Sequence, residues 1–239
     1  MARKKGPQVQ QAYEYIKTKI QNFEIPPGGA VSDHALEQDL NMSRSPIREA
    51  ILRLAAEGLV EFTGKGAQVT NITLHDIIEI CQVRRAVETA SIEILMENGG
   101  PSPEQREQLT QCFEHLQAAT EPAGNYYYDD QFHDLIMSMS GNHRLVEISH
   151  QMRAQIYRAR WLNCILPERM REAHEEHRAI YQALMASDRE QTVHCIKVHL
   201  DQSEKNFRRI LSSTNLTSNL PPAVPGAAAF AQGYGSSLG

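Results

Sequence analysis

The chain has 239 residues, of which 41% are hydrophobic and 22% charged, and this is the composition of an ordinary soluble globular protein with one or two domains. Its formal net charge of −5 excludes a protein that coats nucleic acid indiscriminately, because such proteins carry an excess of cationic side chains. No apolar run approaches the ~18 residues that cross a bilayer and no apolar segment follows the basic start, so we expect a cytoplasmic protein with no membrane partner.

The first part of the chain predicts three helices followed by a β-hairpin. Apolar residues three and four apart indicate a helix that ends before the breaker "PPGG" at 26–29, and Ser32 is placed to cap a short second helix. A third helix begins where Ser43 or Ser45 can cap it, and Gly58 suits its end. Two short strands, "LVEF" and "AQVT", flank the turn "TGKG". This order is typical of a winged helix-turn-helix.

The remainder of the chain carries no further strand pattern. Six helical segments separated by short breaks predict an antiparallel bundle: 73–97, 103–119, 125–139, 142–163, 167–187 and 189–211, the last with Asp188 as a cap. We therefore expect a mainly α protein with a winged helix-turn-helix domain at 8–70 and an all-helical domain at 73–211. The uncharged residues 212–239, rich in Gly, Pro, Ala and Ser, predict a disordered tail.

The four cysteines are expected to be reduced and buried. They are widely scattered and include no C-x-x-C pair: Cys81, Cys112, Cys164 and Cys195. Disulfide-stabilised domains and thiolate metal sites show closer, paired spacings, so neither is indicated.

Two arginines mark the start of the third predicted helix as a DNA-reading element. Arg44 and Arg48 lie four residues apart and project from one side of that end. In a helix-turn-helix this end enters the major groove, where arginine suits bidentate contact with guanine O6 and N7. Ser43 and Ser45, at the positive helix start, suit phosphate oxygens.

Lys65 and Gly66, at the predicted hairpin tip, suit a close approach to the DNA backbone or minor groove. Residues 1–70 hold nine Lys and Arg against eight Asp and Glu, so net charge does not indicate whether this part of the chain binds DNA. The placement of its cationic side chains must decide that question.

Two alternatives to DNA reading stay open. In the first, the two arginines are solvated surface charges, with Arg48 paired to a nearby carboxylate. In the second, the winged helix contacts another protein. The basic start, Arg3 to Lys5, reaches a neighbouring groove or is a frayed end.

Histidines and one aspartate in the helical domain have the spacing of metal ligands. Asp129 and His133 lie at i and i+4, on one helical face. Two later segments offer a further pair each, His174 with His177 and His194 with His199. One carboxylate and three imidazoles that converge inside a bundle would hold a divalent ion such as zinc or nickel, or manganese. The alternative is that each histidine is hydrogen-bonded in the core or lies at the surface.

Residues 8–70 resemble the DNA-binding domain of GntR-family bacterial transcription regulators. The resemblance is carried by "IPPGGAVSDHALEQDLNMSRSPIREAILRLAAEGLV" and "GKGAQV". It implies operator contacts from positions that here are Ser43, Arg44, Arg48 and Gly66. Some members use a further arginine in the preceding helix, where this chain has His34. That difference implies an altered operator preference.

Residues 73–210 resemble the FCD effector domain of the FadR subfamily, with "VRRAVE", "DDQFHDLIMSMSGN", "EHRAIYQAL" and "KVHLDQS" in order. Members of the metal-binding branch place their ligands at positions that are here Asp129, His133, His177 and His199. His174 and His194 then become surface or outer residues, and His115, His143 and His150 match no ligand position.

The same resemblance implies a small carboxylate effector that Arg84 contacts, although a salt bridge from Arg84 to Glu88 at i+4 explains this arginine equally well. The sequence therefore predicts a homodimeric regulator, a repressor in this interpretation, that binds double-stranded operator DNA and responds to a small organic acid. A metal-dependent enzyme acting on a small carboxylate is the alternative, since an ion held by these ligands could activate water.

Overall fold

A computed structural model describes residues 6–21, 24–71, 73–152 and 166–213. These residues form two compact units, one on each side of residue 72. The basic start at 3–5, Cys164 and the predicted tail from residue 214 onward lie outside the described residues, as does much of the segment expected to be helical at 142–163.

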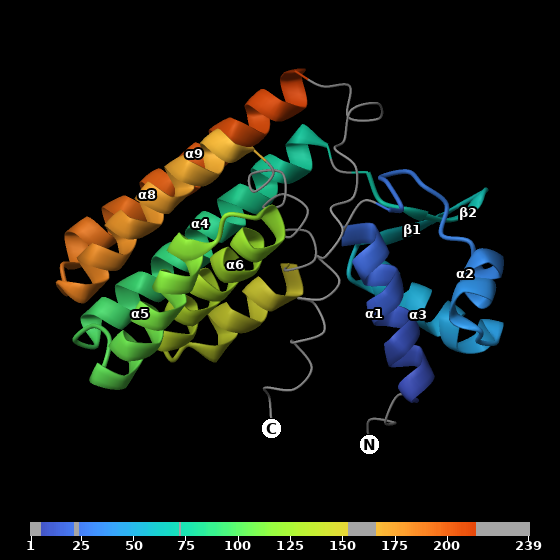
Figure 1. Cartoon of the computed structure of the whole chain (residues 1–239), viewed down its shortest axis with the longest axis horizontal. Helices are drawn as coiled ribbons and strands as arrows, with labels where there is room; N and C mark the ends of the chain where they lie inside the picture. The colour runs from blue at the N-terminus through green and yellow to red at the C-terminus, as the bar shows by residue number, and fades with distance from the viewer. Residues whose placement is uncertain (1–5, 22–23, 72, 153–165, 214–239) are drawn as a thin grey trace. The chain divides into compact units, whose positions relative to one another are not determined.

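The N-terminal unit is a winged helix-turn-helix, as the sequence predicts (Figure 1). Three helices precede a two-stranded antiparallel sheet: α1 (Pro7–Gln21), α2 (Asp33–Leu40), α3 (Arg44–Ala56), β1 (Val60–Thr63) and β2 (Gly66–Val69). Helices α1 and α3 pack against each other through buried aliphatic side chains such as Ile16 and Leu54, both of which are fully buried. This packing buries one side of α3 against α1 and leaves the opposite side of α3 exposed to solvent.

The turn between α2 and α3 is built by local side-chain and backbone preferences. Ser32 caps α2 by accepting a hydrogen bond from the backbone N–H of Ala35, as predicted. Asn41 ends α2 in the left-handed conformation, with φ 50°, which asparagine tolerates better than most residues. Ser43 occupies the N-cap position of α3, but its side chain makes no capping hydrogen bond.

The wing is a tight hairpin in which Thr63 pairs with Gly66 and Val60 with Val69. Gly66 has φ 107°, a conformation that favours glycine. The proline-glycine segment after α1, predicted only to break a helix, also pairs with this hairpin. The backbone N–H of Val31 donates to the carbonyl of Ala67 at 2.8 Å, and the N–H of Gly28 donates to that of Val69 at 2.8 Å. This pairing fixes the hairpin to the segment that leads into α2.

The C-terminal unit is a bundle of helices, which confirms the mainly α architecture (Figure 1). Its helices are α4 (Leu74–Glu97), α5 (Pro103–Ala118), α6 (Pro122–Met139), a helix at 143–152, α8 (Pro167–Met185) and α9 (Arg189–Ser213). Helix α4 packs beside α6 and α9, while α8 packs beside α5 and α9. Asp188 accepts a hydrogen bond from the N–H of Gln191 at 2.9 Å and so caps α9, as predicted.

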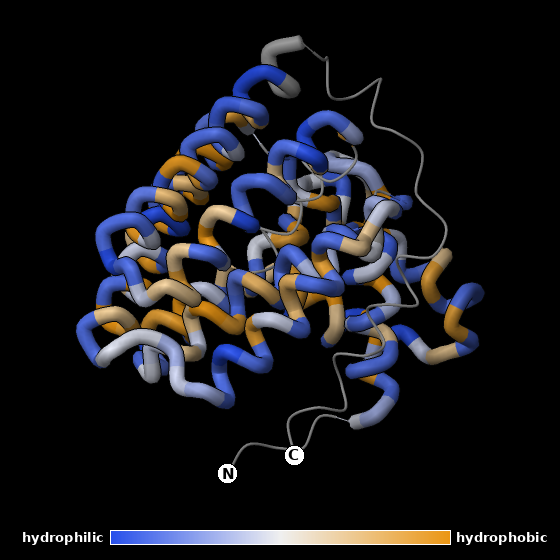
Figure 2. Tube along the Cα trace, turned by 60° about the vertical axis from the view of Figure 1, so that its left-hand side comes forward, coloured by the Kyte–Doolittle hydropathy of each residue, from blue (hydrophilic) through white to orange (hydrophobic). Residues whose placement is uncertain are grey.

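Hydrophobic and hydrophilic positions alternate along these helices (Figure 2). Phe132, Leu109 and Ile180 are among the fully buried members of the core. Cys81 and Cys195 are buried, as predicted, whereas Cys112 is only half-buried, and the thiols of all three are free. Among the residues that the structure describes, no helix combines the length and apolarity needed to cross a bilayer.

The core also encloses charged and polar side chains. Arg84, Glu88, Asp129, His133, Arg169, His177 and His199 are all less than 9% exposed. Burying such groups costs free energy unless they find partners. Their contacts define the candidate site of this unit.

Candidate DNA-reading surface and metal centre

The side chains predicted to contact DNA all lie on the surface of the N-terminal unit. These residues are His34 in α2, Ser43, Arg44, Ser45 and Arg48 at the start of α3, and Lys65 and Gly66 at the hairpin tip. The Arg44 and Arg48 side chains are 56% and 65% exposed, which leaves them accessible to a ligand.

Each of these arginines forms an ion pair with a carboxylate of α2. Arg44 Nε donates to Glu37 Oε2 at 2.9 Å, and Arg48 Nε donates to Asp33 Oδ2 at 3.0 Å. The sequence anticipated a carboxylate partner for Arg48 only. His34 Nδ1 lies 3.7 Å from Glu37 Oε2 at the same surface. The pairs leave the arginines exposed, so they are compatible with both a surface-charge role and a DNA-reading role.

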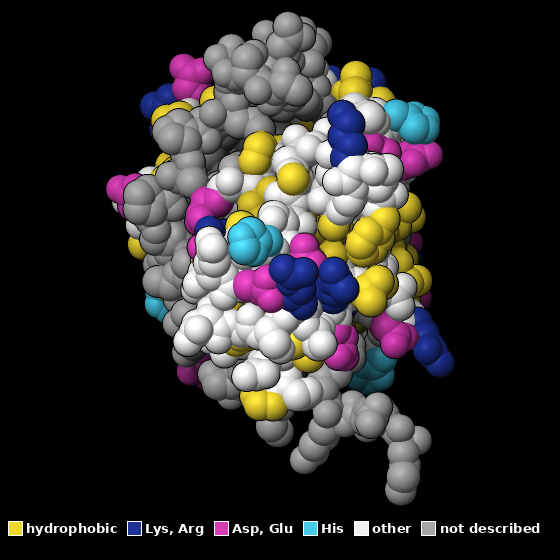
Figure 3. Space-filling view, turned by 90° about the vertical axis from the view of Figure 1, so that its right-hand side faces the viewer, with side chains coloured by type: hydrophobic (Ala, Val, Ile, Leu, Met, Phe, Trp, Pro, Cys, Tyr) yellow, Lys and Arg dark blue, Asp and Glu magenta, His cyan; other side chains and the backbone are white. Residues whose placement is uncertain are grey.

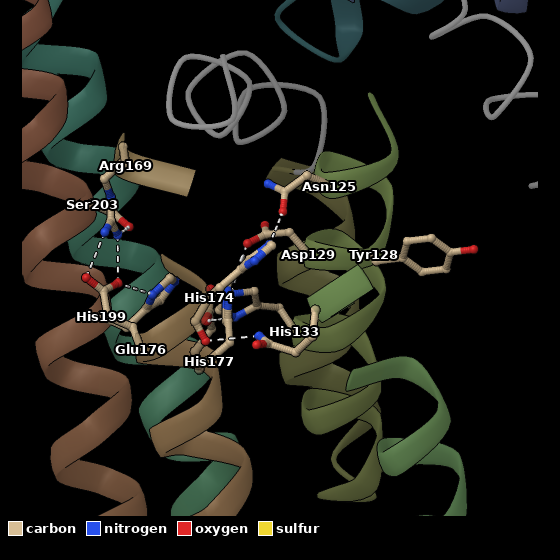
Figure 4. A network of polar contacts seen from close by, with 12 residues as sticks. Asn125, Tyr128, Asp129, His133, Arg169, His174, Glu176, His177, His199 and Ser203 are labelled. Carbon is tan, nitrogen blue, oxygen red and sulfur yellow. Dashed lines mark hydrogen bonds and ion pairs between the residues drawn. The ribbon is translucent and has the colours of Figure 1, made fainter. Parts of the chain in front are cut away.

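In the helical unit the four predicted metal ligands lie together. Asp129 and His133 extend from α6, His177 from α8 and His199 from α9, and all four are buried (Figure 4). One potential ligand atom from each lies within 4.8 Å of the others. His177 Nε2 is 3.2 Å from His133 Nε2 and 3.2 Å from Asp129 Oδ1. The bundle therefore brings together residues from three helices that are up to 70 positions apart.

Two glutamates set the orientation of two of these imidazoles. His133 Nδ1 lies 2.7 Å from Glu88 Oε2, and His199 Nδ1 lies 2.7 Å from Glu176 Oε2. We assign the proton of each ring to Nδ1, because the carboxylate is the acceptor. The Nε2 atoms of both rings then present lone pairs towards the cluster, and this is how outer carboxylates commonly orient histidine ligands of metals.

Each of these two glutamates also accepts hydrogen bonds from a buried arginine. Arg84 Nε donates to Glu88 Oε1 at 2.9 Å, and the Nη atoms of Arg169 donate to both Glu176 oxygens at 2.7 Å. Burial alone would raise the pKa of Glu176, but the hydrogen bonds from His199 and Arg169 outweigh it and lower that pKa to about 2. Burial lowers the pKa of His199 to about 3, and a neutral imidazole is the form that binds metal.

The donor set fits a divalent cation. The Nε2 lone pairs of His133 and His199 and a carboxylate oxygen of Asp129 come together in the cluster. These atoms repel one another unless a cation or a proton lies between them. Two ligand atoms about 2.1 Å from one ion lie about 3.0 Å apart at a right angle and about 3.4 Å apart at a tetrahedral angle. The separations of 3.2 Å around His177 Nε2 fall in this range, and the 3.9 Å between His133 Nε2 and Asp129 Oδ1 corresponds to a wider angle at the ion. His177 is held by the Phe132 ring, with centroids 5.3 Å apart.

Comparison with known proteins identifies the family. Residues 8–69 match the model of bacterial regulatory proteins of the gntR family, and residues 79–202, more than half of the chain, match the FCD domain. The chain belongs to the GntR family of transcriptional regulators, with an FCD domain. The resemblance to the GntR family and to the FCD domain is thereby confirmed.

Relatives of this GntR-family chain are named as regulators. It is 25% identical over 211 residues to the HTH-type transcriptional regulator YdhC of Bacillus subtilis (strain 168), covering 87% of this chain and 94% of YdhC. It is also 25% identical over 211 residues to the HTH-type transcriptional repressor RspR of Escherichia coli (strain K12), covering 84% of this chain and 89% of RspR. The comparisons therefore place the chain among transcriptional regulators, not among metal-dependent enzymes.

Solved structures share the fold. The E. coli protein McbR/YncC matches with a TM-score of 0.72 at 23% identity, over 86% of this chain and 99% of that one. A putative GntR regulator from Rhodococcus sp. RHA1 matches with a TM-score of 0.73 at 20% identity, over 85% of this chain and 99% of that one. At these identities the match speaks for the fold alone.

The remaining histidines of this GntR-family chain lie apart from the four clustered ligands. His174, three residues before His177, is half-buried and its Nε2 lies 2.6 Å from Asn125 Oδ1. His115, His143, His150 and His194 are exposed. His177 and not His174 is therefore the histidine of α8 that the fold delivers to the cluster.

Arg84, predicted to contact an effector, forms the alternative salt bridge to Glu88 and has a side chain only 3% exposed. Its Nη2 is buried without a hydrogen-bond partner in the described part of the chain.

Sequence reasoning missed Arg169, Glu88 and Glu176 as partners of the cluster. The i+4 spacing of Arg84 and Glu88 was a visible signal, but no sequence pattern links Glu88 to His133, 45 residues later.

Proposed function

We propose that this regulator binds operator DNA as a homodimer and that a small organic acid, bound at a divalent metal ion in residues 73–211, changes its affinity for the operator. Residues 8–70 would read the DNA, in the cytoplasm of a bacterial cell, and repression is the proposed sense of regulation. The observation that carries the proposal is the buried convergence of Asp129, His133, His177 and His199, with Glu88 and Glu176 behind two of the rings.

The proposed cofactor is a divalent ion, zinc or nickel, or manganese. Three imidazole nitrogens and one carboxylate oxygen form a mixed N/O ligand set that suits these borderline cations. When bound, the ion would supply a Lewis acid with coordination positions open to an acidic ligand. The protein residues fix the ligand orientation, because Glu88 and Glu176 hold the protons of His133 and His199 on the far side of each ring.

The proposed effector is a small carboxylate. An anion at the cluster would face a cationic centre. Arg84 supports this charge preference because its Nη2 donors are buried and have no hydrogen-bond partner among the residues that the structure describes. A buried donor that lacks an acceptor costs free energy, which an anionic ligand or a water molecule would recover. The effector changes operator affinity only if it binds the DNA-competent and DNA-incompetent states with different affinities.

The proposed DNA contacts come from the surface around α3. Arg44 and Arg48 would read base edges, while Ser43 and Ser45 would bind phosphates. Lys65, Gly66 and His34 lie on the same unit and would contact the backbone or an adjacent groove. A homodimer would place two α3 helices about 34 Å apart on a pseudo-palindromic operator.

A thermal-shift screen of small organic acids, with and without a chelator, tests the sensor part of this function. We expect at least one carboxylate to raise the unfolding temperature of the metal-loaded protein and to have no effect after chelation. At 100 times its dissociation constant a ligand adds about 2.7 kcal/mol to the stability. A carboxylate that stabilises the chelated protein equally would argue against binding at the ion.

Glu176→Gln should weaken metal binding without removing a ligand. The change weakens the charge-assisted bond from Arg169 and no longer fixes the proton of His199 on Nδ1. We expect an approximately 10- to 100-fold loss of zinc affinity, measured by competition with a chromophoric chelator. Glu175→Gln, one residue earlier and exposed, is the matched control and should leave the affinity unchanged. Equal affinities for both variants and the wild type would show that Glu176 does not orient a ligand.

A further inference from the structure

The start of α3 and one side of α2 are joined by two parallel ion pairs. Asp33 and Glu37 lie at i and i+4 on α2. Asp33 pairs with Arg48 and Glu37 with Arg44, and these arginines lie at i+4 and i on α3. Acidic and cationic side chains lie against one another on the face shown in Figure 3. The hydrogen bond from Arg48 is the main reason that the pKa of Asp33 is lowered.

These two ion pairs contribute little to the stability of the fold. All four side chains are at least 24% exposed, and exposed ion pairs contribute only about 0.2–1 kcal/mol each. A carboxylate beside a DNA-facing helix also carries a cost, since it repels phosphates. Their placement directly against Arg44 and Arg48 therefore calls for a role in binding.

The geometry of the contact leaves the arginines competent to read bases. Each carboxylate accepts from Nε, at 2.9 Å for Arg44 and 3.0 Å for Arg48. A guanidinium has five N–H donors, and four of them are on the two Nη atoms. An arginine held through Nε can therefore still present its Nη donors to guanine, with fewer rotamers to lose on binding.

We propose that Glu37 and Asp33 are specificity-determining positioning residues, which hold Arg44 and Arg48 in the orientation that reads base edges and oppose their use as general phosphate contacts. This inference rests on the proposed DNA-reading role of the two arginines. On non-specific DNA an arginine must turn towards a phosphate and leave its carboxylate, which is then unpaired next to the polyanion. On the operator the pair is retained. The carboxylates thus weaken non-specific binding more than specific binding.

The test compares Glu37→Ala with Asp39→Ala in the full-length protein. Both remove one negative charge from α2, but Asp39 pairs with Lys19 at 3.3 Å and has no contact with Arg44 or Arg48 in the structure. Glu37 is preferred to Asp33 because Asp33 also stabilises the start of α2. Dissociation constants are measured against a duplex selected from a random library by the wild-type protein and against a scrambled duplex of equal length and composition, over a range of salt concentrations.

We expect Glu37→Ala to lower the ratio of scrambled to selected dissociation constants by about 2- to 5-fold. On the scrambled duplex its salt dependence should steepen by about one unit, as one more phosphate contact forms. Glu37→Gln, which keeps the side-chain length, should change both quantities in the same direction. Asp39→Ala should leave the ratio unchanged. The inference is overturned if the ratio is unchanged in Glu37→Ala, or if Asp39→Ala lowers it equally.

Two further variants separate this inference from the proposed function. In an Arg44→Ala background, the addition of Glu37→Ala should no longer change the ratio, because Glu37 acts through Arg44. If Arg44→Ala itself leaves binding to the selected duplex unchanged, the DNA-reading role of Arg44 falls. If Arg44→Ala weakens that binding while Glu37→Ala leaves the ratio intact, only the positioning role falls.

Discussion

Replacing His177 by alanine is expected to abolish stoichiometric binding of a divalent ion. His177 Nε2 lies 3.2 Å from both His133 Nε2 and Asp129 Oδ1, so its loss removes a donor next to two of the other three. The affinity should fall by more than the ~10- to 100-fold that the loss of an outer hydrogen-bond partner costs. The ion content of the dialysed protein, measured by elemental mass spectrometry, should drop from one per chain to none.

The stability of the helical unit provides a second measurement of the same change. Zinc at 100 times its dissociation constant should stabilise the wild-type protein by about 2.7 kcal/mol, or about 5–10 °C in unfolding temperature. His177→Ala should show no such shift, and the near-isosteric Asp129→Asn should show a reduced one. His174→Ala is the matched control, because His174 is on the same helix but contacts Asn125. A full ion content in His177→Ala, or none in the wild type, would contradict the assignment.

Arg48→Ala is expected to weaken operator binding by about 5- to 150-fold, the cost of about 1–3 kcal/mol that follows from losing one bidentate base contact. The side chain is 65% exposed, so the fold should be retained. Competition and salt titrations in a fluorescence-anisotropy assay measure this effect, using a duplex selected by the wild-type protein. The loss should be larger on that duplex than on a scrambled one.

Arg144→Ala serves as the control for charge alone. This side chain is 88% exposed on the helical unit, and its removal changes the net charge by the same amount as Arg48→Ala. We expect it to bind the selected duplex like the wild type. If Arg48→Ala leaves both the affinity and the salt dependence unchanged, α3 does not read DNA through this residue.

The N-terminal fold could be predicted because each of its elements carries a local signal. Apolar spacing marks α1 and α3, Ser32 marks the start of α2, and the Gly64–Lys65 turn marks the wing. The pairing of the proline-glycine segment with β2 was missed. That pairing depends on backbone hydrogen bonds between residues about 40 positions apart, such as Gly28 and Val69, and no side-chain pattern records them.

The metal cluster shows a different limit. The i, i+4 spacing of Asp129 and His133 predicts that they share a helical face, but nothing in the spacing distinguishes His177 from His174 on the next ligand helix. Tertiary packing decides, because it buries His177 against Phe132 and leaves His174 half-buried. The family resemblance predicted His177 and not His174 as the ligand. The structure shows that Glu176 and Glu88 contact ligand histidines, and the sequence cannot predict these contacts because they form between helices that are distant in the chain.

Operator affinity measured with and without an effector acid tests the central claim most directly. The wild-type protein, loaded with its ion, is titrated against the selected duplex in the presence and absence of a carboxylate found in the stability screen. We expect the acid to change the dissociation constant by about 5- to 150-fold, the usual range of allosteric coupling, and to have no effect on His177→Ala. An equal response of the wild type and His177→Ala, or an unchanged affinity in the wild type, would contradict an acid sensor built on this metal site.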